Sequence, residues 1–394
     1  MSAFTERGLQ RLHDALARHV DSGDVPGLVA LVSRHGETHV ETLGRFAVEE
    51  SPPMRRDTIF RIASSSKPIT AAAAMLLVED CVLRLDDPVD DWLPELANRR
   101  VLSRPDATIE DVVPAHRSIT LRDLLTFASG FGLPFTAGDV PFVRAMAEAG
   151  LAPSATPTQL GPDDYLRRMG ELPLLHQPGE GWLYHHGMDV ISILIARASG
   201  RSLGAFLEER LFRPLGMNDT AFYVPEQKLD RLPTTYARDP GSPGLTVYDR
   251  ARGGAWSRPP VFESGGGGLV STVDDCHAFF RMLLQGGEHQ GQRLLSRASV
   301  ELMTSDQLTP RQTAHGRPLG DDLGWGFGCS VVVQRRQVGG NVGCFGWTGG
   351  TGTTTYADPA EGLVYILFTQ RLMEGAFPQP WMLDFSTATY AALD

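Results

Sequence analysis

The chain reads Ser64-Ser65-Ser66-Lys67-Pro68-Ile69-Thr70-Ala71 at the position that decides its fold. Apolar residues recur with helical spacing from there to about Asp80, and Pro68 is compatible with the first turn of a helix. The pattern therefore predicts a helix that begins at or just after Ser64. Residues three apart share one face of a helix, so Ser64 and Lys67 should lie together at the positive end of its dipole.

Lys67 stands out against the composition of the chain. Lysine and arginine together number 36, but only Lys67 and Lys228 are lysines. Arginine keeps its proton in proteins, whereas a buried lysine can lose its proton and act as a base. A GC-rich genome would also favour arginine, so composition leaves open both a catalytic and an incidental Lys67. We interpret Lys228, which lies in a polar segment, as a surface charge.

Ser64 needs a base if it is to act as a nucleophile, because a serine hydroxyl is weakly nucleophilic at neutral pH. The 11 histidines of the chain leave a serine–histidine arrangement open. The alternative base is a neutral lysine one helical turn away, and burial can lower the pKa of a lysine far enough for that role. A tyrosine can share such a proton relay.

The bulk composition limits the partners of the protein. A formal net charge of −11 argues against nucleic acid and against an anionic membrane surface as partners. No run of 18 apolar residues is present, and the N-terminus lacks the apolar region of a signal peptide. The four cysteines are scattered, so we expect neither a metal site nor a cofactor. We expect a cytoplasmic protein that acts on a small molecule, in an oligomeric state that the sequence leaves open.

Strand patterns occur near both ends of the chain and helical patterns in the middle. Strands are expected at 27–33, 38–43, 328–334, 342–347, 351–357 and 362–369, and terminal helices at 5–22 and 381–392. The late strands alternate with turns, as in an antiparallel meander. We therefore expect one α/β domain from residues 1–84 and 262–394, with a mostly helical domain, 85–261, inserted in it. The polar stretch 224–262 is expected to be a long surface excursion.

Further motifs follow one another in order along the chain. They are Phe60-Arg61-Ile62-Ala63, Leu85-Asp86-Asp87-Pro88-Val89, Ile119-Thr120-Leu121-Arg122-Asp123-Leu124-Leu125-Thr126, Ser129-Gly130, Pro178-Gly179, Tyr184, Pro214-Leu215-Gly216-Met217-Asn218-Asp219-Thr220 and Gly324-Trp325-Gly326-Phe327-Gly328. Together with the Ser64–Lys67 motif, they resemble the serine β-lactamase and penicillin-binding protein superfamily, in its class C-like branch, over residues 25–370. The resemblance implies an α+β, transpeptidase-like fold with an antiparallel sheet flanked by helices.

Two departures from the class C pattern make the chain most similar to family VIII carboxylesterases. The usual Tyr-x-Asn motif is replaced by Tyr184-His185-His186, and the usual Lys-Thr-Gly motif by Trp347-Thr348-Gly349. The asparagine and the lysine of those motifs bind parts of a β-lactam. Their replacement by a histidine and an indole leaves acyl-transfer chemistry intact and suits a neutral ester.

The resemblance also implies roles for individual residues. Ser64, Lys67 and Tyr184 would be catalytic, and the N–H groups of Ser64 and Gly350 would form the oxyanion hole. Trp347, Thr348, Gly349 and His186 would contact the substrate, and the Gly265–Gly268 run would face the cleft. Ser64 would form an acyl-enzyme while Lys67 and Tyr184 carry the proton, and which of the two is the formal base stays open.

The function expected from these residues is hydrolysis of carboxylic esters with short or medium acyl groups. Three alternatives remain at this point. The protein would be a β-lactamase or D-amino-acid peptidase, an acyltransferase of the same fold, or a binding or sensor protein that is acylated without turnover. The substrate's identity and stereochemistry do not follow from the sequence.

Overall fold

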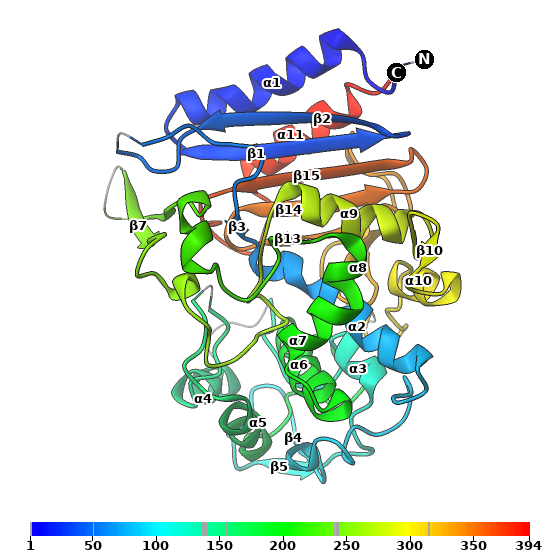
Figure 1. The fold of residues 1–394 in the computed structure, drawn as a ribbon. Coiled ribbons are helices and arrows are strands. Elements are labelled where there is room, and N and C mark those ends of the chain that lie inside the picture. Colours follow the sequence, from blue (N-terminus) through cyan, green and yellow to red (C-terminus); the bar gives the residue numbers. More distant parts are fainter. Residues whose placement is uncertain are drawn as a thin grey trace.

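A seven-stranded antiparallel sheet is built from strands near both ends of the chain (Figure 1). It belongs to a computed structural model that describes residues 2–49, 51–135, 140–154, 156–239, 241, 244–313 and 316–394. The order across the sheet is β11 (Leu323–Trp325), β12 (Ser330–Val332), β13 (Phe345–Gly349), β14 (Thr353–Asp358), β15 (Leu363–Thr369), β1 (Gly27–Arg34) and β2 (Glu37–Gly44). The predicted antiparallel sheet is thereby confirmed, and β11 joins the predicted strands at one edge.

The pairing of β1 with β15 joins strands from the N-terminal and C-terminal parts of the chain in one sheet. Their register places Leu31 opposite Ile366, and both strands are buried along nearly their whole length. Successive side chains of a strand point to opposite faces, so these strands supply apolar residues to two separate layers. Leu28 packs in the layer on one face, and Val29 packs in the layer on the other.

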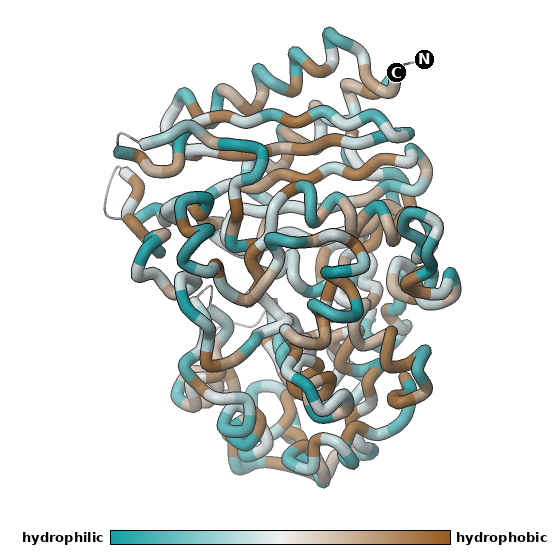
Figure 2. Tube along the Cα trace, viewed as in Figure 1, coloured by the Kyte–Doolittle hydropathy of each residue, from teal (hydrophilic) through white to brown (hydrophobic). Residues whose placement is uncertain are grey.

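Helices from the two ends of the chain cover one face of the sheet. They are α1 (Glu6–Asp21) and α11 (Pro380–Tyr390), which lie side by side where both termini meet (Figure 1). Along α1 the tube in Figure 2 alternates between teal and brown, as expected for an amphipathic helix. Leu16 of α1 and Phe385 of α11 are fully buried against this face.

The opposite face is covered by α9 (Val273–Leu284) and α2 (Lys67–Glu79). The Thr272 side chain caps α9 by accepting a hydrogen bond from the Asp275 N–H. In α2, every residue from Lys67 to Leu77 is buried. A helix that is apolar all round must be enclosed on all sides, and α2 runs between the sheet and the remaining helices. Its first residue therefore lies at the boundary of the two layers.

The middle of the chain forms a helical layer below the sheet in Figure 1. It contains α3 (Leu121–Leu125), α4 (Pro141–Glu148), α5 (Pro162–Glu171), α6 (His186–Ser199), α7 (Leu203–Leu207) and α8 (Arg213–Leu215), with the short strands β4 (Arg100–Leu102) and β5 (Val112–Pro114). One hydrophobic core joins Val29 of the sheet to Ile191 of this layer. The division into two domains at 84/85 and 261/262 stays a prediction. Among the described residues no single helix is long and apolar enough to span a membrane, although α6 taken together with the bent continuation Leu203–Leu215 meets that test.

The expectation of a surface excursion over 224–262 is wrong for part of this stretch, although the described residues between Tyr236 and Trp256 are half-buried or exposed. This stretch contains the hairpin of β6 (Thr235–Arg238) and β7 (Leu245–Asp249), and Trp256 is buried in a small core of its own. Arg61 is also buried here, and its Nε donates to Asp249 Oδ2 at 2.7 Å. The polar composition conceals this packing, because a few apolar residues and one buried ion pair supply the contacts.

Removal of the carboxylate in the Arg61–Asp249 pair should destabilise the fold strongly. Asp249→Ala leaves a buried guanidinium without its counter-ion, so we expect the free energy of unfolding to fall by about 3 kcal/mol. Urea denaturation followed by circular dichroism measures this loss. The exposed pair of Arg84 and Asp87 supplies the control, and Asp87→Ala should change the free energy by less than about 0.5 kcal/mol. Equally small losses of unfolding free energy in both variants would contradict a stabilising role of the buried Arg61–Asp249 pair.

Candidate active site

The structure brings Ser64 and Lys67 together at the start of α2, as the sequence predicts. A 3-10 turn, Ala63–Ser66, precedes the helix, and Lys67 Nζ lies 2.8 Å from Ser64 Oγ. The turn is tied to the sheet because Thr353 Oγ1 donates a hydrogen bond to the Ile62 carbonyl. Ser64 is thus held at the wall of a cavity, and Lys67 is fully buried next to it.

Burial determines the charge of Lys67. Removal of the ammonium group from water lowers the pKa of Lys67 to about 7, and the opposing attraction of Asp189 does not outweigh this effect. Besides Ser64, the Nζ atom contacts the Gly266 carbonyl oxygen and lies 3.3 Å from His185 Nδ1. A substantial fraction of Lys67 is therefore a neutral amine at neutral pH, placed to accept a proton from Ser64.

Tyr184, the third predicted catalytic residue, lies against Lys67, whose Nζ is 4.8 Å from the centre of the tyrosine ring. Paired backbone hydrogen bonds with Leu133 hold Tyr184 just before α6, and its Oη accepts a hydrogen bond of 2.6 Å from Trp347 Nε1. Burial raises the pKa of Tyr184 to about 12, while its hydrogen bonds with Ser64 and Trp347 act in the opposite direction. Tyr184 is therefore a protonated phenol within hydrogen-bonding reach of Ser64.

Ser64 opens into a cavity of about 310 Å³, called here the serine cavity. Much of its wall is apolar, with Leu133, Phe135 and Met373 among the lining residues. The predicted substrate contacts Trp347 and Thr348 of β13 also line it. Among the described residues, the wall includes no lysine, arginine, aspartate or glutamate. This cavity therefore suits a neutral and largely apolar group.

The predicted oxyanion-binding residues border the same cavity. Ser64 lies in the first turn of a helix, where backbone N–H groups have no partner within the helix, and Gly350 directly follows β13. An oxygen held between two such donors would be stabilised most strongly when it carries negative charge. The role of these two N–H groups stays a prediction.

The structure corrects the choice of histidine. The resemblance implies that His186 contacts the substrate, but its ring is buried in the helical layer, where Nε2 lies 2.7 Å from the Leu151 carbonyl oxygen. His185 lines the serine cavity instead. Its φ is +86° and its ψ is −64°, and the His186 N–H donates to the Tyr184 carbonyl at 3.3 Å, which is the geometry of a γ-turn. This turn sends the two consecutive histidines to different sides, and no pattern in the sequence reveals it.

Gly349 lies behind the cavity wall rather than in it. A Cβ atom at this position would lie 2.2 Å from the Ile62 carbonyl oxygen, so glycine lets β13 pack tightly against the segment before Ser64. Glycine is therefore required here by packing, and the expected contact of Gly349 with the substrate stays a prediction. The Gly265–Gly268 run does face the cleft, because Gly267 lines the serine cavity and the Gly266 carbonyl contacts Lys67.

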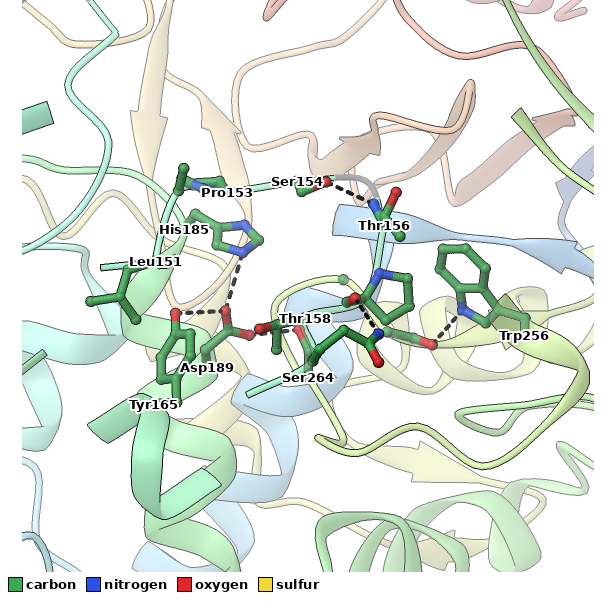
Figure 3. A pocket seen from close by; sticks show the side chains of 16 residues that line it. Leu151, Pro153, Ser154, Thr156, Thr158, Tyr165, His185, Asp189, Trp256 and Ser264 are labelled. Carbon is green, nitrogen blue, oxygen red and sulfur yellow. Dashed lines mark hydrogen bonds and ion pairs between the residues drawn. The ribbon is translucent and has the colours of Figure 1, made fainter. Parts of the chain in front are cut away.

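A second cavity of about 290 Å³ adjoins the first (Figure 3). The two cavities share four lining residues, Pro153, Ser154, His185 and Gly267. Asp189, on α6, lies in the wall of the second cavity, 3.2 Å from His185 Nε2. The sequence reasoning missed both His185 and Asp189. Their only signal is a spacing of four residues at the start of a helix, which is common in proteins.

Ser202 is a further candidate nucleophile by sequence, because Gly200-Arg201-Ser202-Leu203-Gly204 has the GxSxG form of an α/β-hydrolase. In the structure it follows a helix rather than a strand, and its side chain caps α7 by accepting from the Ala205 N–H. It lines neither of the two cavities. Ser202 is therefore a helix cap. Within the described ranges, no three His, Cys, Asp or Glu side chains are arranged to hold a metal ion.

Comparison with known proteins places this chain in a family. The Beta-lactamase family model matches residues 12–389. Protein Rv1367c of Mycobacterium tuberculosis is 38% identical over 363 residues, which cover 89% of this chain and 87% of that protein. Esterase EstB of Burkholderia gladioli is 31% identical over 383 residues, which cover 93% of this chain and 91% of the esterase.

The fold is also found among solved structures. The structure described as EstCE1, a hydrolase with promiscuous acyltransferase activity, superposes with a TM-score of 0.79 at 24% identity. The match covers 97% of this chain and 98% of EstCE1, and at this identity it speaks for the fold alone. The family model, by contrast, spans nearly the whole sequence and includes Ser64, Lys67 and Tyr184. The chain therefore belongs to the beta-lactamase family.

Proposed function

We propose that this protein hydrolyses carboxylic esters with short or medium acyl groups, through an acyl-enzyme on Ser64. The observation that carries the proposal is the fully buried amine of Lys67, 2.8 Å from Ser64 Oγ, with a pKa lowered to about 7 by burial. The 31% identity to Esterase EstB over most of both chains supports the same reaction type.

The reaction proceeds in two steps. Ser64 Oγ attacks the ester carbonyl carbon while its proton passes to Lys67, and the negative oxygen is bound by the N–H groups of Ser64 and Gly350. The tetrahedral intermediate then breaks its bond to the alcohol oxygen, which takes up the proton and leaves. Water then attacks the carbonyl carbon of the acyl-enzyme and gives a proton to the relay. The second tetrahedral intermediate breaks its bond to Ser64 Oγ, which takes that proton back, and the carboxylic acid is released.

The pKa values favour Lys67 as the proton acceptor. At neutral pH much of Lys67 is a neutral amine, whereas Tyr184, with a pKa near 12, is almost entirely protonated. A protonated phenol can still take part by giving its proton to the leaving oxygen and receiving another from Lys67. The Trp347 N–H holds the Tyr184 oxygen in place for this exchange.

The serine cavity argues for a neutral substrate. Its described wall has no cationic side chain that would attract a carboxylate such as that of a β-lactam. Trp347 stands where the family's Lys-Thr-Gly motif has its lysine, and the indole N–H is already bonded to Tyr184. An uncharged ester whose acyl group fits about 310 Å³ meets these conditions.

Acyl transfer to an acceptor other than water is the second candidate function. The adjoining cavity of about 290 Å³ meets the first at His185 and Gly267, so an acceptor alcohol bound there would lie next to the acylated Ser64. EstCE1 is itself described as a hydrolase with promiscuous acyltransferase activity. Product analysis after addition of an alcohol separates the two reactions, because transfer forms a new ester in place of the free acid.

Replacement of Lys67 tests the neutral-amine mechanism. Arginine keeps the positive charge but does not lose its proton, so Lys67→Arg should lower kcat/KM for p-nitrophenyl butyrate by about 1000-fold or more. Lys228→Arg is the matched control at the only other lysine, whose Nζ donates to the half-buried Asp219 and which lines neither cavity. It should stay within about twofold of the wild type. An active Lys67→Arg enzyme would refute the mechanism.

The pH dependence of ester hydrolysis follows from the pKa of Lys67. The base must be neutral, so kcat/KM should rise as the pH increases through about 7 and then level off as Lys67 becomes fully deprotonated. Initial rates between mildly acidic and mildly alkaline pH measure this limb, after subtraction of the rate of Ser64→Ala. A rate that is independent of pH across this range would contradict a titrating lysine base.

The residue at position 347 should control the choice between esters and β-lactams. We expect the wild type to favour p-nitrophenyl butyrate over nitrocefin by at least about 100-fold in kcat/KM. Trp347→Lys places a cation in the cavity wall and should narrow this ratio by about tenfold or more, while Trp347→Phe should not narrow it. Nitrocefin hydrolysis at a rate equal to that of the ester in the wild type would overturn the ester assignment.

A further inference from the structure

We propose that Asp189 and His185 are positioning residues, which hold the amine of Lys67 so that its lone pair faces the Ser64 hydroxyl. The inference rests on the proposed function and adds a second set of residues to it. It assigns a role in the reaction to a buried carboxylate and to a strained histidine that the Ser64, Lys67 and Tyr184 relay does not itself use.

Asp189 is a buried carboxylate on which four donors converge. Its Oδ1 accepts from Ser264 Oγ at 2.6 Å and from the Gly266 N–H at 3.1 Å, and its Oδ2 lies 3.2 Å from both Tyr165 Oη and His185 Nε2. Figure 3 shows the Tyr165, Ser264 and His185 side chains directed at this one group. Burial alone would raise the pKa of Asp189. The electrostatic attraction of His185 and the hydrogen bonds from His185 and Ser264 nevertheless hold this pKa well below its usual range. The group is therefore ionised.

The ionised carboxylate fixes the tautomer of His185. A carboxylate without a proton can only accept hydrogen bonds, so the hydrogen of the neutral imidazole must be on Nε2. The pKa of His185 is lowered by burial and by the neighbouring Lys67, which keeps the ring neutral. The lone pair is then on Nδ1, and Nδ1 lies 3.3 Å from Lys67 Nζ. His185 consequently presents an acceptor to the lysine.

The hydrogen atoms of Lys67 then have one consistent arrangement. A neutral amine has two hydrogens and one lone pair, and Nζ has three polar neighbours. Two of these, the Gly266 carbonyl and His185 Nδ1, can only accept, so they take the two hydrogens. The lone pair is left toward the third neighbour, Ser64 Oγ, which carries the proton to be removed.

One carboxylate holds both of these acceptors. Asp189 binds the backbone N–H of Gly266 and the Nε2 of His185, so the two groups that orient Lys67 share a single anchor. The φ of +86° at His185 shows that its backbone is held in a strained turn, and such strain persists only where surrounding contacts maintain it. The arrangement is thus built by tertiary contacts on both sides of Lys67.

Two replacements of His185 separate its two contacts. In His185→Asn the side-chain oxygen can occupy the place of Nδ1. This variant keeps an acceptor for Lys67 but is too short to make the hydrogen bond to Asp189. In His185→Gln the amide extends to the place of Nε2. This variant keeps the hydrogen bond to Asp189 but leaves Lys67 Nζ without the acceptor that Nδ1 supplies. We expect kcat/KM for p-nitrophenyl butyrate to fall by less than about tenfold in His185→Asn and by about 100-fold in His185→Gln.

Asp189→Asn gives a second and independent readout. The charge of Asp189 raises the pKa of Lys67, so its removal should shift the acid limb of the kcat/KM profile to lower pH. A larger neutral fraction of Lys67 would by itself increase the rate at acidic pH. Because the amide also disrupts both acceptors, we expect the plateau to fall by about 100-fold. The groups that face Lys67 and His185 in this profile are Tyr184, His186 and Asp189.

Stability is measured alongside activity, because asparagine tolerates a positive φ better than glutamine. Thermal unfolding of each variant shows whether it is folded at the assay temperature. If His185→Gln is unfolded at that temperature, the Asp189→Asn variant tests the positioning role instead. The same two replacements at His277, a histidine of α9 that lines neither cavity, serve as the control. Both should remain within about threefold of the wild type.

The outcomes separate this inference from the proposed function. If folded His185→Gln matches His185→Asn, or if Asp189→Asn keeps the wild-type plateau, the positioning role is wrong. The proposed function stands in that case as long as Ser64→Ala and Lys67→Arg are inactive. If Ser64→Ala hydrolyses the ester at the wild-type rate, the proposed function itself fails and this inference with it.

Discussion

The enclosure of one lysine amine beside a serine hydroxyl is the constraint on which the rest of the site depends. An ammonium group is costly to remove from water, so Lys67 is kept inside only because it can be neutral and because its neighbours satisfy it. In the proposed mechanism, the same burial makes the amine of Lys67 a base, because it lowers the pKa of Lys67 to about 7. Packing and chemistry are therefore not separable at this position, since a looser fold around Lys67 would hydrate the amine and raise its pKa toward the ordinary value.

The architecture supplies that enclosure by placing α2 between two layers. The sheet covers the first turn of the helix from one side through β13, and α6 covers it from the other. Three segments far apart in the sequence meet at Lys67, namely the turn before α2, the Tyr184–His185 turn and the Gly265–Gly268 run. Each segment brings a polar atom close to the Lys67 amine, which the surrounding hydrophobic core would otherwise leave without a polar neighbour.

Membership in the beta-lactamase family separates what is kept from what has changed in this site. In the proposed function, Ser64, Lys67 and Tyr184 form the group that carries out acyl transfer, and Trp347 stands where the resemblance to class C β-lactamases places a lysine, so this part of the wall is apolar. The indole N–H donates a hydrogen bond to the Tyr184 oxygen and so holds this oxygen in position. In the proposed function, the choice of substrate thus changes through the wall of the cavity while the proton relay stays the same.

The sequence by itself determined the antiparallel sheet, the helix that follows Ser64 and the pairing of Ser64 with Lys67, because these depend on local periodicity and on a spacing of three residues. Only the tertiary structure decided that His185 rather than His186 meets the cavity and that Gly349 packs behind it. It also decided that Val224, Leu229, Leu232 and Trp256 of the polar stretch 224–262 are buried. The physical reason is that a strained turn, a close backbone approach and a buried ion pair all arise from contacts between distant segments, which leave no periodic trace in the chain.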